Sequence, residues 1–192
     1  MKDTKSILLA GVGGQGIILM SKAFTAGLVA AGYDVKMSEV HGMAQRGGSV
    51  STQVRYGEKV FSPIIGRGEA DVLVAFEKME AVRYAEFLKP SGSAVVNDAE
   101  IVPLPVASGA VAYPGGVLDA MQKAFRVRVV PASGLAEKLG SIRCMNIVLL
   151  GALVNALGLD KIDWKAALTE TLPPKILKLN LDAFEAGFHY GG

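Results

Sequence analysis

Four glycines between residues 11 and 16 form the pattern with the clearest chemical meaning in this sequence. Gly11, Gly13, Gly14 and Gly16 follow a short apolar run and precede a proline-free stretch at 17–31. This order predicts a strand, a glycine-rich turn and a helix. Glycine at such a turn adopts backbone angles that other residues avoid and leaves the backbone open to a ligand. Free N–H groups at the start of the helix favour a phosphate or a carboxylate, so the turn predicts an anion-binding site.

The same turn satisfies the G-x-G-x-x-G pattern of dinucleotide-binding proteins through Gly11, Gly13 and Gly16. Glu39 lies about 20 residues beyond it, near the end of the second predicted strand, where an acid that binds a ribose hydroxyl is expected. Gln15 departs from that pattern by adding a polar side chain, which we expect to point toward the ligand. The simpler alternative is that these glycines only allow a helix to pack closely against a strand. Four glycines in one turn exceed what packing requires.

A second group of polar residues follows the second predicted strand. His41, Gln45, Arg46 and Gly47 belong to the loop 41–48, which contains three glycines. Arg46 presents a fork of donors that suits a carboxylate or a phosphate, and His41 exchanges a proton near neutral pH. Because both glycine-rich segments follow strands, we expect them at one edge of the sheet, where α/β proteins bind ligands. The alternative is that Arg46 is a solvated cation and His41 caps the local backbone.

Other reactive residue types are scarce, and we assign no catalytic residue. Cys144 is the only cysteine, so this chain alone holds neither a disulfide nor an iron–sulfur cluster. Two histidines are too few for a predicted metal site. We expect Cys144 to be a buried small residue, Asn146 to cap a helix, and Glu77 to start its helix rather than to face the glycine turns.

The order of predicted elements indicates the fold class. Strands are predicted at 7–9, 34–40, 49–56, 59–65, 71–76, 93–97 and 127–130, and extended segments at 101–105 and 110–113. Helices are predicted at 17–31, 77–88, 117–125, 133–139, 146–157, 163–171 and 175–186. Segments 49–56 and 59–65 are expected to form a hairpin. Alternating strands and helices predict a three-layer α/β/α sandwich with a mostly parallel, Rossmann-like sheet and a helical C-terminal tail, in one domain over residues 1–192.

Composition excludes several functional classes. The chain has 20 basic and 18 acidic residues, a balance that gives no indication of nucleic-acid binding. The longest apolar runs, such as 147–154, are too short to span a bilayer, so we expect no membrane segment. Residues 1–4 are followed by no signal-peptide core, and the expected location is the cytoplasm.

The two glycine segments together resemble a known family. The sequence GVGGQG at 11–16, followed by SEVHGMAQRGGSV at 38–50, resembles the gamma-type component of 2-oxoacid:ferredoxin oxidoreductases. The second segment is most similar to the beta subunit of the indolepyruvate branch. Ser62-Pro63, the strand at 71–76 and the segment 146–151 also fit, so the resemblance extends over nearly the whole chain.

This resemblance implies a division of labour. The family decarboxylates a 2-oxoacid oxidatively, here an aryl 2-oxoacid, transfers the acyl group to coenzyme A and passes electrons to ferredoxin. Thiamine diphosphate and iron–sulfur clusters would belong to a larger alpha subunit, and this chain would be inactive alone. The residues that the resemblance implies for ligand binding would contact coenzyme A phosphates, a substrate carboxylate or the edge of the interface with the partner subunit. They are Gly11, Gly13, Gly14, Gln15, Gly16, Glu39, His41, Gln45, Arg46 and Gly47.

The residues leave two other interpretations open. In the first, the chain is a free-standing oxidoreductase that binds NAD or a flavin nucleotide at the glycine turn. In the second, it is a structural scaffold whose glycine turns serve protein contacts. Titration of the pure protein with NADH or FMN distinguishes the first of these from a subunit role, because micromolar affinity would favour the nucleotide-binding oxidoreductase. An isolated small subunit would expose an apolar interface and would favour a homodimer.

Overall fold

The computed structural model describes residues 4–41 and 47–191 of the chain. The strands are β1 (Lys5–Val12), β2 (Asp34–His41), β3 (Ser49–Gly57), β4 (Ala70–Ala75), β5 (Leu88–Asn97) and β6 (Arg126–Val130). The helices are α1 (Ile17–Ala30), α2 (Lys78–Arg83), α3 (Leu104–Ala107), α4 (Val117–Ala124), α5 (Ala132–Lys138), α6 (Met145–Leu157), α7 (Trp164–Thr171) and α8 (Pro174–Phe188). Short 3-10 turns occupy Ala85–Phe87 and Ile142–Cys144. None of the described helices has the length and apolar character needed to cross a membrane.

The strands form one six-stranded sheet in the order β2-β3-β1-β4-β5-β6. The pairs β1–β4, β4–β5 and β5–β6 are parallel, whereas β3 runs antiparallel to both β1 and β2. β3 is therefore the one reversed strand of this sheet. The predicted mostly parallel α/β architecture is confirmed. The order differs from a dinucleotide-binding sheet, in which the second strand lies directly beside the first.

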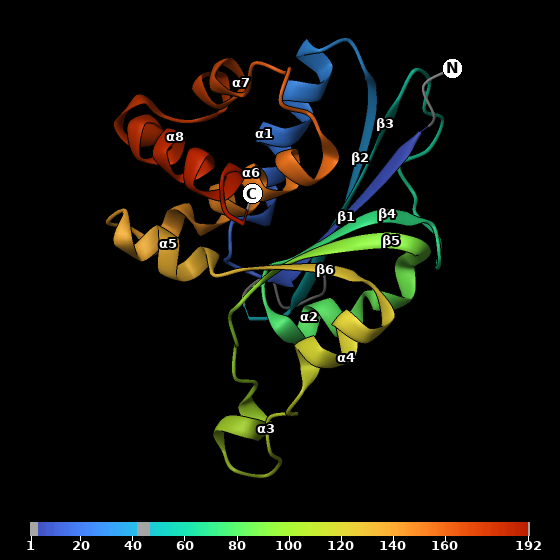
Figure 1. Cartoon of the computed structure of the whole chain (residues 1–192), viewed down its shortest axis with the longest axis vertical. Helices are drawn as coiled ribbons and strands as arrows, with labels where there is room; N and C mark the ends of the chain where they lie inside the picture. Colours follow the sequence, from blue (N-terminus) through green and yellow to red (C-terminus); the bar gives the residue numbers. More distant parts are fainter. Residues whose placement is uncertain (1–3, 42–46, 192) are drawn as a thin grey trace.

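Helices cover both faces of the sheet and complete the three predicted layers (Figure 1). α1 and α5–α8 lie on one face, and α2 and α4 lie on the other. α6 is the centre of the first layer, because it is buried without interruption from Met145 to Val154. The predicted C-terminal helices thus supply most of one layer and much of the core.

Glycines let α6 and α8 approach each other closely. A Cβ atom built on Gly187 would lie 1.8 Å from the carbonyl oxygen of Val148, and one on Gly151 would lie 2.1 Å from the carbonyl oxygen of Phe184. The absence of a side chain at Gly151 and Gly187 is therefore what permits this close helix packing.

The predicted hairpin of 49–56 with 59–65 is wrong. Both edges of β3 are occupied, by β1 and β2, so segment 58–69 cannot join it as a strand. That segment instead connects β3 to β4 and bonds to side chains of β3. Arg55 Nη1 donates to the carbonyl oxygens of Ser62 and Ile64, and the Ile65 N–H donates to Gln53 Oε1 at 2.7 Å.

The predicted helix 77–88 is also too long. α2 ends at Arg83, and β5 already begins at Leu88 and runs through Pro90. The β4–β5 register shifts between the pairs Ala70–Leu88 and Val72–Ser93, which leaves room for Pro90 in an irregular part of the ladder.

Other boundaries also differ from the predictions. Segment 101–105, predicted to be extended, ends inside α3, and 110–113 forms no strand. Asn146 is the second residue of α6 rather than its cap. The predicted helix 163–171 is confirmed as α7, and Asp163 caps it, since its carboxylate accepts from the Ala166 N–H at 2.9 Å.

Candidate functional site

The first glycine segment forms the predicted strand–turn–helix. β1 ends at Val12, and α1 begins at Ile17. Gly14 and Gly16 have φ angles of 105° and 81°, in the left-handed region that favours glycine. Gly16 is the N-cap of α1 and gives no side-chain hydrogen bond to the helix. The first turn of α1 therefore keeps the N–H groups that a capping side chain would otherwise bind.

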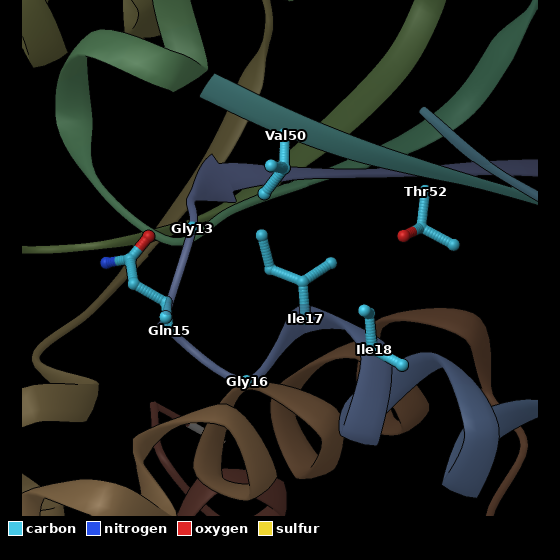
Figure 2. A pocket seen from close by; sticks show the side chains of 8 residues that line it. Gly13, Gln15, Gly16, Ile17, Ile18, Val50 and Thr52 are labelled. Atoms are coloured by element: carbon cyan, nitrogen blue, oxygen red, sulfur yellow. The ribbon is translucent and has the colours of Figure 1, made fainter. Parts of the chain in front are cut away.

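The Gln15 side chain, which the sequence predicted to point toward the ligand, has both ends of its amide hydrogen-bonded to the protein. Its Oε1 accepts from the Val12 N–H at 2.7 Å, and its Nε2 donates to the Phe76 carbonyl oxygen at 3.2 Å. Both ends of the amide therefore bind the protein. Figure 2 shows this side chain directed away from Ile17 and Val50. Gln15 holds the turn to the end of β4.

Close packing explains two of the four glycines. A Cβ on Gly11 would lie 2.7 Å from both Gln15 Oε1 and Phe76 Cβ. A Cβ on Gly16 would lie 2.6 Å from Asn146 Nδ2, whose hydrogen bond to the Gly16 carbonyl oxygen measures 3.0 Å. The packing interpretation therefore holds for Gly11 and accounts for part of the role of Gly16. At Gly14 a Cβ would meet no atom within 4 Å, so its backbone conformation is the reason for glycine there.

The two glycine segments meet directly. The Gly13 N–H donates to the Gly48 carbonyl oxygen at 2.9 Å, and the Gly47 N–H donates to the Gly13 carbonyl oxygen at 3.3 Å. The expectation that both segments lie at one edge of the sheet is correct for these residues. His41 ends β2, where its Cα pairs with Val50. Gln45 and Arg46 lie outside the described residues.

A cavity of about 410 Å³ opens beside the first glycine turn. Its lining comprises Gly13, Gly14, Gln15, Gly16, Ile17, Ile18, Val50 and Thr52. Figure 2 shows Ile17 and Ile18 of α1 facing Val50 and Thr52 of β3 across this space. The cavity thus combines an uncapped helix N-terminus with apolar walls, and it suits a ligand with an anionic group and an apolar or aromatic part.

Sequence reasoning did not identify Ile17, Ile18, Val50 or Thr52 as candidate site residues. The available signal was the alternation of residues 50, 52, 54 and 56, which places Val50 and Thr52 on one face of their strand. The pairing of β3 with β1 decides that this face borders the glycine turn.

Glu39 lies farther from the turn than the dinucleotide pattern requires. Its Cα pairs with Thr52, and Thr52 pairs with Leu9 of β1, so a whole strand separates Glu39 from β1. Two strand spacings amount to about 9.6 Å. This arrangement weakens the interpretation of Glu39 as a ribose-binding acid of an NAD site, and it leaves Glu39 on the same face as the cavity residue Thr52.

Glu77 starts its helix, as predicted. Its carboxylate accepts from the N–H groups of Met79 at 3.0 Å and Glu80 at 2.5 Å, and the residue is almost fully buried. Burial raises the pKa of Glu77 above its ordinary value of 4.5, with a smaller contribution from the nearby Glu80, although the two N–H donors oppose this shift.

We expect the variant Glu77→Gln to reveal this raised pKa in the pH dependence of stability. A folded-state pKa above the unfolded value gives a stabilising contribution that is fully present below about 4.5 and is lost as the pH rises through the folded-state pKa. The unfolding free energy of the unsubstituted chain should therefore fall relative to that of Glu77→Gln as the pH rises above about 4.5. Urea unfolding of both proteins across this range measures the difference, and parallel pH profiles would contradict the prediction.

Cys144 is buried, as predicted, and burial raises the pKa of its thiol. The thiolate is thereby disfavoured, so this cysteine is a poor nucleophile. Within residues 4–41 and 47–191, no group of three or more His, Cys, Asp or Glu side chains is arranged to hold a metal ion.

Comparison with known proteins identifies the family. The family profile described as pyruvate ferredoxin/flavodoxin oxidoreductase matches residues 6–190. The chain belongs to this family. The resemblance inferred from the two glycine motifs and the predicted oxidoreductase class are thereby confirmed.

Curated members of the pyruvate ferredoxin/flavodoxin oxidoreductase family match this chain almost end to end. It is 38% identical over 190 residues to the indolepyruvate oxidoreductase subunit IorB of Thermococcus kodakarensis, with 95% of this chain and 93% of that protein covered. It is 39% identical over 191 residues to IorB of Archaeoglobus fulgidus, with 96% and 94% covered.

A solved structure of the same class shares the fold. It is the 2-oxoglutarate:ferredoxin oxidoreductase from Magnetococcus marinus with 2-oxoglutarate, coenzyme A and succinyl-CoA bound. The TM-score is 0.72 at 25% identity, and the similarity covers 97% of this chain and 31% of that chain. This chain therefore corresponds to one part of that larger polypeptide.

Proposed function

We propose that this chain is the small, gamma-type subunit of a 2-oxoacid:ferredoxin oxidoreductase that acts on indolepyruvate or a related aryl 2-oxoacid. The observation that carries the proposal is the match of 38% and 39% identity to two IorB subunits over more than nine-tenths of each protein. The reaction is the oxidative decarboxylation of the 2-oxoacid to an acyl-CoA, with ferredoxin as electron acceptor.

The larger subunit would hold the redox and decarboxylation chemistry in this proposal. One cysteine cannot ligate an iron–sulfur cluster by itself, because such clusters require several thiolates. We place thiamine diphosphate and the iron–sulfur clusters in that partner, and the assembled enzyme in the cytoplasm. The present chain would be inactive alone and would contribute binding and orientation rather than a bond-making side chain.

The glycine turn is the proposed binding site for the phosphate groups of coenzyme A. Three features support this: the uncapped N-terminus of α1, the exposed backbone of Gly14, and the adjoining cavity of about 410 Å³. The bound coenzyme A named for the Magnetococcus marinus enzyme points to the same ligand. Arg46 and Gln45 are proposed as further donors, with His41, Glu39 and Gly47 at the rim, facing either the ligand or the partner.

Co-expression with the larger subunit tests the proposed function. We expect dye reduction that depends on indolepyruvate and coenzyme A when both chains are present, and none with either chain alone. Comparison of kcat/KM among 2-oxoacids then selects the substrate. A stable complex that is inactive on every 2-oxoacid, together with micromolar binding of NADH or FMN to this chain, would contradict the proposal in favour of a nucleotide-binding oxidoreductase.

A further inference from the structure

The two glycine segments of the candidate site share one anchor outside the cavity. This anchor is the β4–α2 junction, from Phe76 to Glu80. The Phe76 carbonyl oxygen accepts from Gln15 Nε2 at 3.2 Å, which fixes the first segment. The same oxygen accepts from Asn97 Nδ2 at 3.1 Å, so its own position is set by β5. No residue of this junction lines the cavity.

Glu80 fixes the second segment through Ser49. Its carboxylate accepts a hydrogen bond from Ser49 Oγ and a second bond from Arg83 Nε at 2.9 Å. The hydroxyl of Tyr84 lies 3.3 Å from Ser49 Oγ. Glu80 is only 3% exposed, so its carboxylate is shielded from competing water, whereas the Arg83 side chain that binds it is largely exposed. A hydrogen bond to a charged acceptor in such surroundings is about twice as strong as a neutral one.

Ser49 links this cluster to the cavity along the backbone. It follows Gly47 and Gly48, which bond to Gly13, and it precedes Val50, which lines the cavity. Successive strand residues face opposite sides of the sheet, so Ser49 faces α2 while Val50 faces α1. The Glu80 carboxylate therefore lies on the α2 face of the sheet, opposite the cavity, and does not occupy the anion site.

We propose that Glu80 is a positioning residue for the binding site at the glycine turn. By holding Ser49, it sets the backbone of residues 47–50, and with it the spacing between Gly13 and the Val50 wall. The proposal rests on the proposed function, because it assumes that the site binds coenzyme A. It predicts that loss of the Ser49–Glu80 hydrogen bond weakens coenzyme A binding, although neither residue lines the cavity.

Steady-state kinetics of the complex with the larger subunit provide the first test. Ser49→Ala should raise the KM for coenzyme A about fivefold, as expected for the loss of one hydrogen bond, with kcat and the KM for the 2-oxoacid little changed. Ser49→Thr keeps the hydroxyl and should restore the original KM. Ser51→Ala is the matched control, since Ser51 is a buried serine on the same face of β3. Glu80→Ala should resemble Ser49→Ala, and the double variant should add little to either.

Hydrogen–deuterium exchange of the same complexes gives a readout that does not depend on the ligand. Peptides that contain Gly13 should exchange faster in Ser49→Ala than in Ser51→Ala, because the Gly13 N–H bonds to Gly48. The variant Ile18→Glu, which places a carboxylate at a residue lining the cavity, tests coenzyme A binding at the turn directly. If Ile18→Glu raises the KM for coenzyme A and Ser49→Ala does not, the positioning role is refuted and the proposed function stands. If neither changes that KM, coenzyme A binding at the turn is refuted. The exchange rates then decide whether Ser49 and Glu80 still position the segment, and unchanged exchange would overturn that role.

Discussion

Ile18→Glu is expected to raise the KM for coenzyme A by at least about tenfold in the assembled enzyme. Ile18 lies in the first turn of α1, lines the cavity and is 40% exposed. A carboxylate there would face the proposed phosphate position. Two unit charges of like sign about 5 Å apart repel by about 3 kcal/mol at an effective dielectric constant of about 20, whereas tenfold in affinity needs only about 1.4 kcal/mol.

The control for this variant is Ile18→Gln, which has nearly the same shape as Ile18→Glu and no charge. An acid in the first turn stabilises a helix, so Ile18→Glu should not unfold the chain. The KM for the 2-oxoacid should stay close to that of the unsubstituted enzyme in both variants. Equal values of the KM for coenzyme A in Ile18→Glu and Ile18→Gln would show that no anion binds at this helix end. A rise in both would indicate a steric effect of losing isoleucine.

Gly187→Ala is expected to destabilise the folded chain by about 3 kcal/mol, the upper end of the range for overpacking. The new Cβ would lie 1.8 Å from the Val148 carbonyl oxygen and 2.7 Å from its carbonyl carbon. These are backbone atoms in the middle of buried α6, so they cannot yield as a flexible side chain would. The two helices would have to separate, and contacts in the core between them would be lost.

Gly134→Ala is the matched control for this substitution. Gly134 lies inside α5, and a Cβ there would meet no atom within 4 Å. Alanine in a helix interior is about 0.5–1 kcal/mol more favourable than glycine, so this variant should be slightly stabilised. Urea unfolding of the two variants and the unsubstituted chain measures both effects. A Gly187→Ala protein as stable as Gly134→Ala would show that the α6–α8 contact is looser than the structure indicates.

Short stretches of sequence determined much of this protein. The apolar run before Gly11 and the proline-free stretch after Gly16 predicted β1, the turn and α1, because strand, turn and helix preferences act over a few residues. Asp163 and Glu77 were recognised as helix starts for the same reason, since a capping carboxylate bonds to N–H groups two or three residues away. The residues of the two glycine motifs also carried the resemblance to the family that the profile match over residues 6–190 then confirmed.

The tertiary structure decided the features that depend on residues far apart in the chain. Segment 49–56 has the alternation of a strand, and this alternation is compatible both with a hairpin to 59–65 and with a position between β2 and β1. Only the residues buried against each face of the strand select the second arrangement. Gln15 is polar and lies in a turn, yet its orientation depends on the Phe76 carbonyl oxygen, 61 positions later. Ser49 meets Glu80 for the same kind of reason, 31 positions apart.

The candidate site therefore combines both kinds of information. The sequence by itself determined that an uncapped helix N-terminus follows a glycine turn, because backbone conformation there is a local property. The tertiary structure decided that Val50 and Thr52 form the opposite wall, that Glu39 is displaced by one strand, and that the β4–α2 junction anchors the site. These depend on strand order and side-chain partners, which arise from the packing of the whole sheet and its helices.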